Sequence, residues 1–216
     1  GGTAVLASVH GPAAPRQSGL ETPQAQLSLV VASGGTSSTE GGPVSPDVEE
    51  WEGLLRGVLE SCVHRTQYPR CVIQIVCHIL SHDGSVLAAC LHASVAALMD
   101  SGIAMLQVPT AVALRVVPRN GGGYHLSMDP STGQELDMDL SPHDPPTALV
   151  CVVVTANQKN DAKVLALHSR GGRAPTAVWP TAVALATRAR PALTNFMKLA
   201  LQHKLQSKIR NGDQGS

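Results

Sequence analysis

The alternation of apolar and polar residues divides the chain into short segments of two kinds. A period of two, or an unbroken apolar run rich in Val and Ile, predicts strands. These strands are expected at residues 3–9, 24–32, 70–80, 103–118, 124–128, 147–156 and 163–168. Their spacing predicts that the first two pair antiparallel, that 124–128 follows a hairpin turn, and that the last two pair with each other.

Apolar residues at helical spacing predict three main helices, at residues 47–62, 85–100 and 176–209. Gly102 follows the second helix, at the position where glycine commonly ends one. Pro180 and Pro191 should restart or kink the third. Because a strand, a helix and a strand follow one another over residues 70–118, we also expect a right-handed βαβ crossover there.

Composition limits the class of protein. The chain has 216 residues, of which 43% are hydrophobic, and this suits one α+β domain over residues 1–216 with polar loops at 33–46 and 129–146. Aromatic residues are only 2%, which argues against a surface that stacks bases. The formal net charge is zero, so any RNA contact must be local or shared with partners. No apolar run is long enough to span a bilayer, and no membrane association is expected.

The cysteines and histidines do not predict a metal centre. The five cysteines mostly lie in apolar runs and form no C-x-x-C pair: Cys62, Cys71, Cys77, Cys90 and Cys151. Their odd number and their surroundings predict buried, reduced thiols rather than disulfides or zinc ligands. The nine histidines show no metal-ligand spacing, so we expect no cofactor and no bound metal.

Three stretches of the sequence are more specific. Residues 2–12 read GTAVLASVHGP, a Tyr68-Pro69-Arg70 triplet precedes the strand at 70–80, and residues 83–102 read DGSVLAACLHASVAALMDSG. In this order they resemble the RNase PH family, and in particular the ring subunits of the eukaryotic RNA exosome. The resemblance runs from Gly2 to the C-terminal helix. It implies an RNase PH-like (ribosomal protein S5 domain 2-like) fold with mixed sheets, and a first hairpin that would precede Gly1.

The resemblance implies a ring subunit that supports 3′–5′ RNA processing and degradation by assembling the ring and guiding RNA. The implied partners are other RNase PH-like ring subunits, RNA-binding cap subunits and RNA, and the isolated chain is a candidate homodimer. The implied location is the nucleus, with the nucleolus, and the cytoplasm. We expect no catalysis by the chain itself, for two reasons.

The first reason is the turn before the central helix, which in active members of the family reads D-G-G-T-R-T and holds phosphate through its Thr and Arg. The matching residues here are Gly84, Ser85 and Val86. The Ser85 hydroxyl can still donate to an oxyanion, but Val86 supplies no charge. No Lys or Arg lies between Arg70 and Arg115, so only a cation from a distant segment could replace the missing one.

The second reason concerns the acidic residues that the reaction requires. Active members carry two Asp motifs that act as metal ligand or general acid. Asp129 resembles the first motif in a degenerate form. For the second motif, the favoured alignment places Leu149 where the Asp should be, and the alternative uses Asp137 and Asp139. These three aspartates are either a solvated acidic loop or the remnant of a metal site.

Two arginines complete the candidates, because the family places the region before the central strand near the ring's channel. Arg65 and Arg70 would contact the RNA backbone there. The alternative is that they belong to a solvent-exposed turn before a buried strand. Two other functions stay open: an active phosphate-dependent 3′–5′ exoribonuclease, and a metal-dependent nuclease built on Asp129, Asp137 and Asp139.

Overall fold

The structure is a computed structural model that describes residues 2–15, 22–33, 46–119, 123–136, 148–156, 162–172 and 174–212. Its elements in chain order are β1 (Ala4–Ala13), β2 (Gln26–Ser33), α1 (Pro46–Cys62), the 3-10 turn η1 (Arg65–Gln67), β3 (Val72–Ser81), α2 (Val86–Asp100), β4 (Thr110–Pro118), β5 (Tyr124–Met128), α3 (Thr132–Leu136), β6 (Ala148–Ala156), β7 (Ala162–Gly171) and α4 (Val178–Gly212). The predicted α+β class is confirmed.

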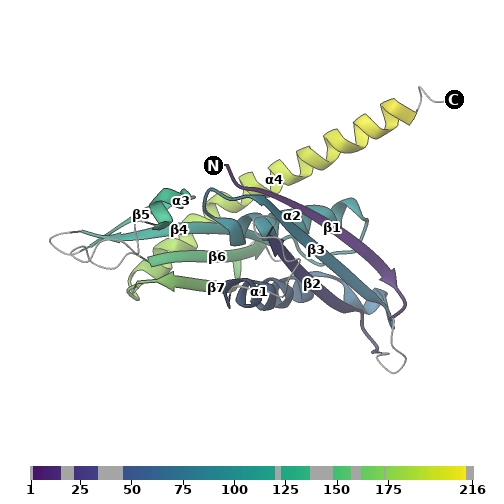
Figure 1. The fold of residues 1–216 in the computed structure, drawn as a ribbon, viewed down its shortest axis with the longest axis horizontal. Helices are drawn as coiled ribbons and strands as arrows, with labels where there is room; N and C mark the ends of the chain where they lie inside the picture. Colours follow the sequence, from purple (N-terminus) through teal and green to yellow (C-terminus); the bar gives the residue numbers. More distant parts are fainter. Residues whose placement is uncertain are drawn as a thin grey trace.

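The strands form two sheets, in the orders β1-β3-β2 and β5-β4-β6-β7 (Figure 1). In the first sheet, β1 is antiparallel to β3 and β2 is parallel to it. The predicted pairing of residues 3–9 with 24–32 is therefore wrong, because β3 lies between the two strands. The physical reason is burial: Ile73, Ile75 and Cys77 of β3 have no exposed surface, and the most apolar strand takes the central place.

The fold contains a βαβ crossover, but not the predicted one. The parallel neighbours β2 and β3 are joined through α1, which is the crossover. The expected unit over residues 70–118 is wrong, since β3 and β4 belong to different sheets and α2 links them. Order along the chain predicts a strand, a helix and a strand, but it does not say whether the two strands share a sheet.

The second sheet is antiparallel throughout, and it confirms the two predicted pairings of β4 with β5 and of β6 with β7. The stretch 129–146, expected to be a loop, contains the short helix α3. Residues 137–147 lie outside the described residues, as does most of the other expected loop, 33–46.

Two hydrophobic clusters hold these layers together. One joins the inner face of the first sheet to α1, α2 and one face of the second sheet. The other packs α4, through Val178, Ala182 and Ala186, on the opposite face of the second sheet. The second sheet is thus covered on both faces. The outer face of the first sheet is open, with Leu6 and Leu80 more than half exposed.

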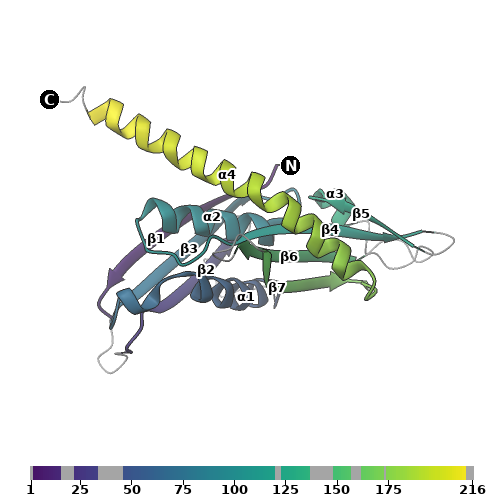
Figure 2. The ribbon, with the colours of Figure 1, turned by 180° about the vertical axis from the view of Figure 1, so that it is seen from behind.

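The helix α4 is continuous from Val178 to Gly212, with Pro191 inside it. The expectation that the helix restarts at Pro180 or Pro191 is wrong, and a kink at either proline stays a prediction. Pro180 lies in the first turn, where the missing N–H has no helical acceptor. Beyond the second sheet, α4 passes α2 and its last turns extend away from the body (Figure 2). Among the described residues, no helix is both long and apolar enough to cross a membrane.

Candidate functional site at the start of α2

The turn that precedes α2 has an unusual backbone. Ser85, which caps the helix, has a φ of 55°, and Gly84 has a φ of 87°. Both values lie in the left-handed region that favours glycine. A Cβ on Gly84 would overlap the carbonyl oxygen of Pro130, so only glycine lets the two segments approach this closely.

Hydrogen bonds tie this turn to the start of β1 and to the segment before α3. The Thr3 hydroxyl donates to the Gly84 carbonyl (2.6 Å) and accepts from the Asp83 N–H (2.8 Å). The Asp83 carboxylate accepts from the N–H groups of Gly2 (3.0 Å) and Thr132 (3.3 Å), and these bonds lower the pKa of Asp83. The turn is therefore fixed from two distant parts of the chain.

A cavity of about 320 Å³, here called the Asp129 cavity, lies on one side of the turn and is lined by Asp129, Ser85 and His92 among others. The His92 Nε2 accepts the N–H of Ala111 (3.0 Å), so the proton of the neutral ring lies on Nδ1. Burial lowers the pKa of His92 to about 4, and the charge of Asp129 opposes this only partly. The imidazole is therefore neutral near pH 7.

A second cavity, of about 280 Å³ and here called the helix-mouth pocket, lies on the other side of the turn. Ser85, Val86 and Leu149 line it together with Arg170, which β7 supplies from the position directly opposite Leu149. His168 also lines the pocket, and its Nε2 lies 3.2 Å from the Glu50 carboxylate. No Asp or Glu is among the described residues that line this pocket.

The predicted phosphate-binding and catalytic residues that the structure describes therefore line two different cavities. Leu149, the residue that the favoured alignment places at the acidic position, lies in the helix-mouth pocket with Val86. Asp129 lies across the turn in the other cavity, and Asp137 and Asp139 fall outside the described residues. The catalytic and metal assignments of these aspartates stay predictions. Within the described ranges, no three His, Cys, Asp or Glu side chains gather closely enough to hold a metal ion.

Arg170 was missed by sequence reasoning. It is 84 positions from Val86 along the chain, and no local pattern relates the two. Its place in the pocket depends on the register of β6 and β7, which pairs Leu149 with Arg170. The pairing of the two segments was predictable, whereas the register was not.

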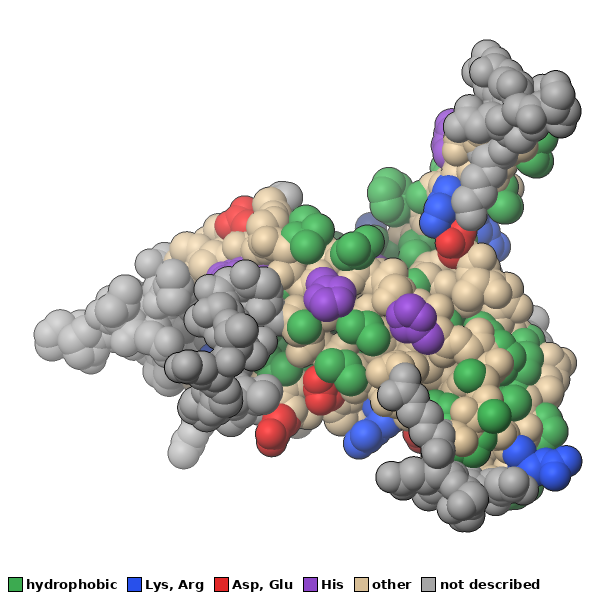
Figure 3. Space-filling view, turned by 45° about the vertical axis from the view of Figure 1, so that its right-hand side comes forward, with side chains coloured by type: hydrophobic (Ala, Val, Ile, Leu, Met, Phe, Trp, Pro, Cys, Tyr) green, Lys and Arg blue, Asp and Glu red, His purple; other side chains and the backbone are tan. Residues whose placement is uncertain are grey.

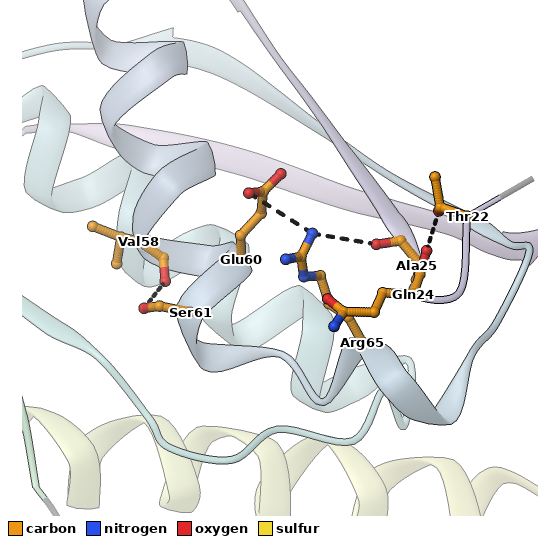
Figure 4. Close-up of polar contacts among 7 residues, drawn as sticks. All are labelled: Thr22, Gln24, Ala25, Val58, Glu60, Ser61 and Arg65. Atoms are coloured by element: carbon orange, nitrogen blue, oxygen red, sulfur yellow. Dashed lines mark hydrogen bonds and ion pairs between the residues drawn. The ribbon is translucent and has the colours of Figure 1, made fainter. Parts of the chain in front are cut away.

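Arg65 makes structural contacts, which Figure 4 shows. Its Nη1 lies 3.8 Å from the Glu60 carboxylate and 3.5 Å from the Ala25 carbonyl oxygen, and its own carbonyl accepts the Ala25 N–H (3.0 Å). Arg65 thus joins the end of α1 to the start of β2. Arg70 is exposed with a φ of 56°, and its N–H donates to the Thr22 carbonyl (3.0 Å). Contact of either arginine with RNA stays a prediction.

All five cysteines are free, and only Cys71 is not fully buried. Burial raises the pKa of Cys90 and of Cys151 to about 12. These thiols are therefore protonated near pH 7, which makes them poor nucleophiles and poor metal ligands.

Comparison with known proteins gives the class of this fold. Residues 1–104 match the family described as the 3′ exoribonuclease family, domain 1 (RNase PH). The crystal structure of rice (Oryza sativa) Rrp46 superposes with a TM-score of 0.75 at 21% identity, and the match covers 94% of this chain and 85% of that one. The chain therefore has the fold of that structure, and its residues 1–104 are similar to domain 1 of the RNase PH family, as the resemblance implied.

Among named relatives, the exosome complex exonuclease RRP46 homolog of Arabidopsis thaliana is 27% identical over 64% of this chain. The exosome complex component RRP46 of Saccharomyces cerevisiae is 29% identical over 65%, and a putative exosome complex component RRP41 of Caenorhabditis elegans is 34% identical over 54%. The matched segments span 54%, 62% and 50% of those relatives, about half of their length.

Proposed function

We propose that the chain is a ring subunit of an RNA exosome, which supports 3′–5′ RNA processing and degradation by assembly and RNA guidance rather than by its own phosphorolysis. The observation that carries this proposal is the helix-mouth pocket. Val86 and Leu149 line it, and the resemblance matches Val86 to a cation of the active members and, in the favoured alignment, Leu149 to an acid. The relatives named as exosome components support the assembly part.

The chemistry explains why these two residues matter. Phosphorolysis requires a phosphate held against its own negative charge while it attacks, and a group that protonates or coordinates the leaving oxygen. An alkyl side chain does neither. Removal of one such group commonly costs two to three orders of magnitude in rate, and in the favoured alignment Val86 and Leu149 occupy both positions.

The proposal includes partners and a location. We infer contacts with other RNase PH-like ring subunits, RNA-binding cap subunits and RNA, and a presence in the nucleus, nucleolus and cytoplasm. A homodimer of the isolated chain belongs to the same proposal. Co-expression with RNase PH-like partners, followed by size-exclusion chromatography with light scattering, tests the assembly. Elution of the chain apart from every such partner would contradict it.

The catalytic part is tested with labelled single-stranded RNA and purified chain, with phosphate, and separately with Mg²⁺ or Mn²⁺ and no phosphate. We expect no nucleoside diphosphate and no cleavage from a folded sample, with an active family member as the positive control. Release of nucleoside diphosphate would contradict the proposal. Metal-dependent cleavage without phosphate would instead indicate the metal-dependent nuclease based on Asp129, Asp137 and Asp139.

One observation favours a second candidate, the active phosphate-dependent exoribonuclease. Arg170 lines the helix-mouth pocket with Ser85, so β7 brings a guanidinium to the pocket that also contains the uncharged Val86. This candidate requires that Arg170→Ala abolish nucleoside diphosphate release. The structure offers it no carboxylate among the described residues that line the pocket.

A further inference from the structure

The charge of α4 differs from that of the rest of the molecule. The chain as a whole has 16 basic and 16 acidic residues. From Val178 to Gly212, however, α4 contains no Asp or Glu, and its basic residues are Arg188, Arg190, Lys198, Lys204, Lys208 and Arg210. The remaining part of the chain is therefore net acidic. Such a separation of charge along one helix is typical of a surface that meets an acidic partner.

The part of α4 that extends from the body also exposes large apolar side chains. Phe196 is 71% exposed, Ile209 68%, Leu205 55% and Leu199 48%. Figure 3 shows apolar and basic side chains together on this projecting helix. At about 100° per residue, Phe196 and Leu205 point to opposite sides of the helix. Side chains of this size on a helix that leaves the body are characteristic of an interaction surface.

A groove of about 700 Å³ lies at the base of this projection, between β1, α2 and α4. Val5 and Val9 of β1 form one wall, and Phe196 and Met197 of α4 form another. The α2 wall is made of alanines such as Ala97, whose small side chains leave the groove deep.

The groove has little free charge of its own. Of its charged residues, Lys204 and Asp100 form an ion pair at 2.8 Å. The other titratable group that lines it is His92, which burial keeps neutral. The groove is thus an apolar trough, and Lys198, whose side chain is exposed, lies on α4 beside it.

We propose that the groove and the distal part of α4 bind an acidic amphipathic segment of a protein partner. The apolar side chains of that segment occupy the groove between β1, α2 and α4, and its carboxylates lie over the exposed Lys198. This is the helix-in-groove form of recognition, with the charge of α4 selecting an acidic ligand. The proposal goes beyond the proposed function and is independent of whether the chain is catalytically active.

Two observations favour a protein over the other polyanions. RNA is bound by rows of cations with stacking aromatic rings, whereas the groove is apolar, its lysine is paired, and Phe196 is its one aromatic side chain. A helix that binds an anionic membrane lies flat on it and buries a single apolar face. Here Phe196 and Leu205 lie on opposite sides, and a concave trough continues the surface, so a flat bilayer would leave half of it uncovered.

The test uses synthetic helical peptides of about sixteen residues with leucines on one face. The other face carries glutamates in the first peptide and lysines in the second. Fluorescence anisotropy measures their binding to the full chain. We expect the acidic peptide to bind with a Kd of about 1–100 µM, more weakly at about 1 M salt, and the basic peptide not to bind.

Three variants locate the site. Phe196→Ala removes an exposed wall residue, Ala200→Trp fills the groove, and Lys198→Glu reverses an exposed charge. Each should weaken binding of the acidic peptide about tenfold or more. Arg188→Glu makes the same charge change at an exposed position of α4 outside the groove and should have little effect. Circular dichroism before and after heating confirms that each variant is folded.

The proposal is overturned if the acidic peptide does not bind the folded chain, or if its binding is unchanged in Phe196→Ala, Ala200→Trp and Lys198→Glu. The same titrations are run with an oligoadenylate of about twelve nucleotides and with phosphatidylserine vesicles. Tighter binding of either one, lost in Phe196→Ala and Lys198→Glu but not in Arg188→Glu, would assign the surface to RNA or to membrane instead.

Discussion

The two sides of the turn before α2 differ in how they are built. On the Asp129 side, the turn is tied by hydrogen bonds from Thr3 and to Asp83, and Gly84 touches the backbone of Pro130. On the pocket side, Val86 and Leu149 face a cavity of about 280 Å³. One side is a network of structural contacts. The other is an open pocket lined by Val86 and Leu149, which the resemblance matches to a cation and, in the favoured alignment, to an acid.

This difference separates the residues that make structural contacts in the turn from the apolar residues that line the helix-mouth pocket. The D-G-S letters of the turn each have a structural explanation here: Asp83 joins two segments, Gly84 permits a close approach, and the Ser85 hydroxyl donates to the Pro130 carbonyl at 3.4 Å. The next residue, Val86, is partly buried against the first hydrophobic cluster and also lines the helix-mouth pocket. The D-G-S letters therefore report the fold of the turn.

The largest loss of stability is expected on the Asp129 side of the turn, when the close approach of Gly84 to Pro130 is blocked. Gly84→Ala should lower the free energy of unfolding by about 3–5 kcal/mol, because a Cβ overlaps the Pro130 carbonyl and φ is 87°. Gly102→Ala is the matched control, since its φ is 73° but nothing lies within 4 Å, and it should cost only about 1 kcal/mol. Urea denaturation measures both. Equal losses would mean that conformation alone explains the effect.

Low pH should lower the free energy of unfolding through protonation of His92, which lines the Asp129 cavity. The folded pKa is about 4 and the ordinary value 6.5, so the neutral ring is favoured by folding. This stability is fully present above about pH 6.5 and is lost as the pH falls towards 4, by about 3 kcal/mol in total. His92→Gln keeps an acceptor for the Ala111 N–H but does not titrate. The difference between the two proteins, measured by urea denaturation from pH 7 to 4, should therefore show this dependence, and a flat difference would refute it.

Loss of a single tie should have a smaller effect. Thr3→Val keeps the shape of the side chain but removes the hydroxyl that bonds both Asp83 and Gly84, which should cost about 1–2 kcal/mol. Thr181→Val, at an exposed position of α4, provides the control and should change stability by less than about 0.5 kcal/mol. If Thr3→Val is as stable as the control, the turn is held by its other contacts.

The smallest effect is expected on the pocket side. Arg170 is exposed, and Arg170→Ala should change the free energy of unfolding by less than about 0.5 kcal/mol. The thermal midpoints of both proteins should respond equally to added phosphate. A stabilisation by phosphate that only the unsubstituted protein shows would give the pocket a ligand, and would favour the second candidate function.

The sequence by itself determined the elements that local chemistry dictates. Continuous runs of Val and Ile became β3 and β6, Gly102 follows the end of α2, and the short segments around residues 124 and 163 form the expected antiparallel pairs. The turn at Gly84 and Ser85 was recognisable from its letters, and so was the family. In each case the cause lies within a few residues, where side-chain pattern and backbone preference act directly.

Only the tertiary structure decided which strands share a sheet and which side chains share a cavity. It placed β3 between β1 and β2, made α1 the crossover, and brought Arg170 into one pocket with Val86. It also carried α4 past Pro191 without a break and left Phe196 exposed beside a groove. These outcomes depend on register and packing between segments far apart in the chain. Such contacts produce no periodic pattern in the sequence of either segment.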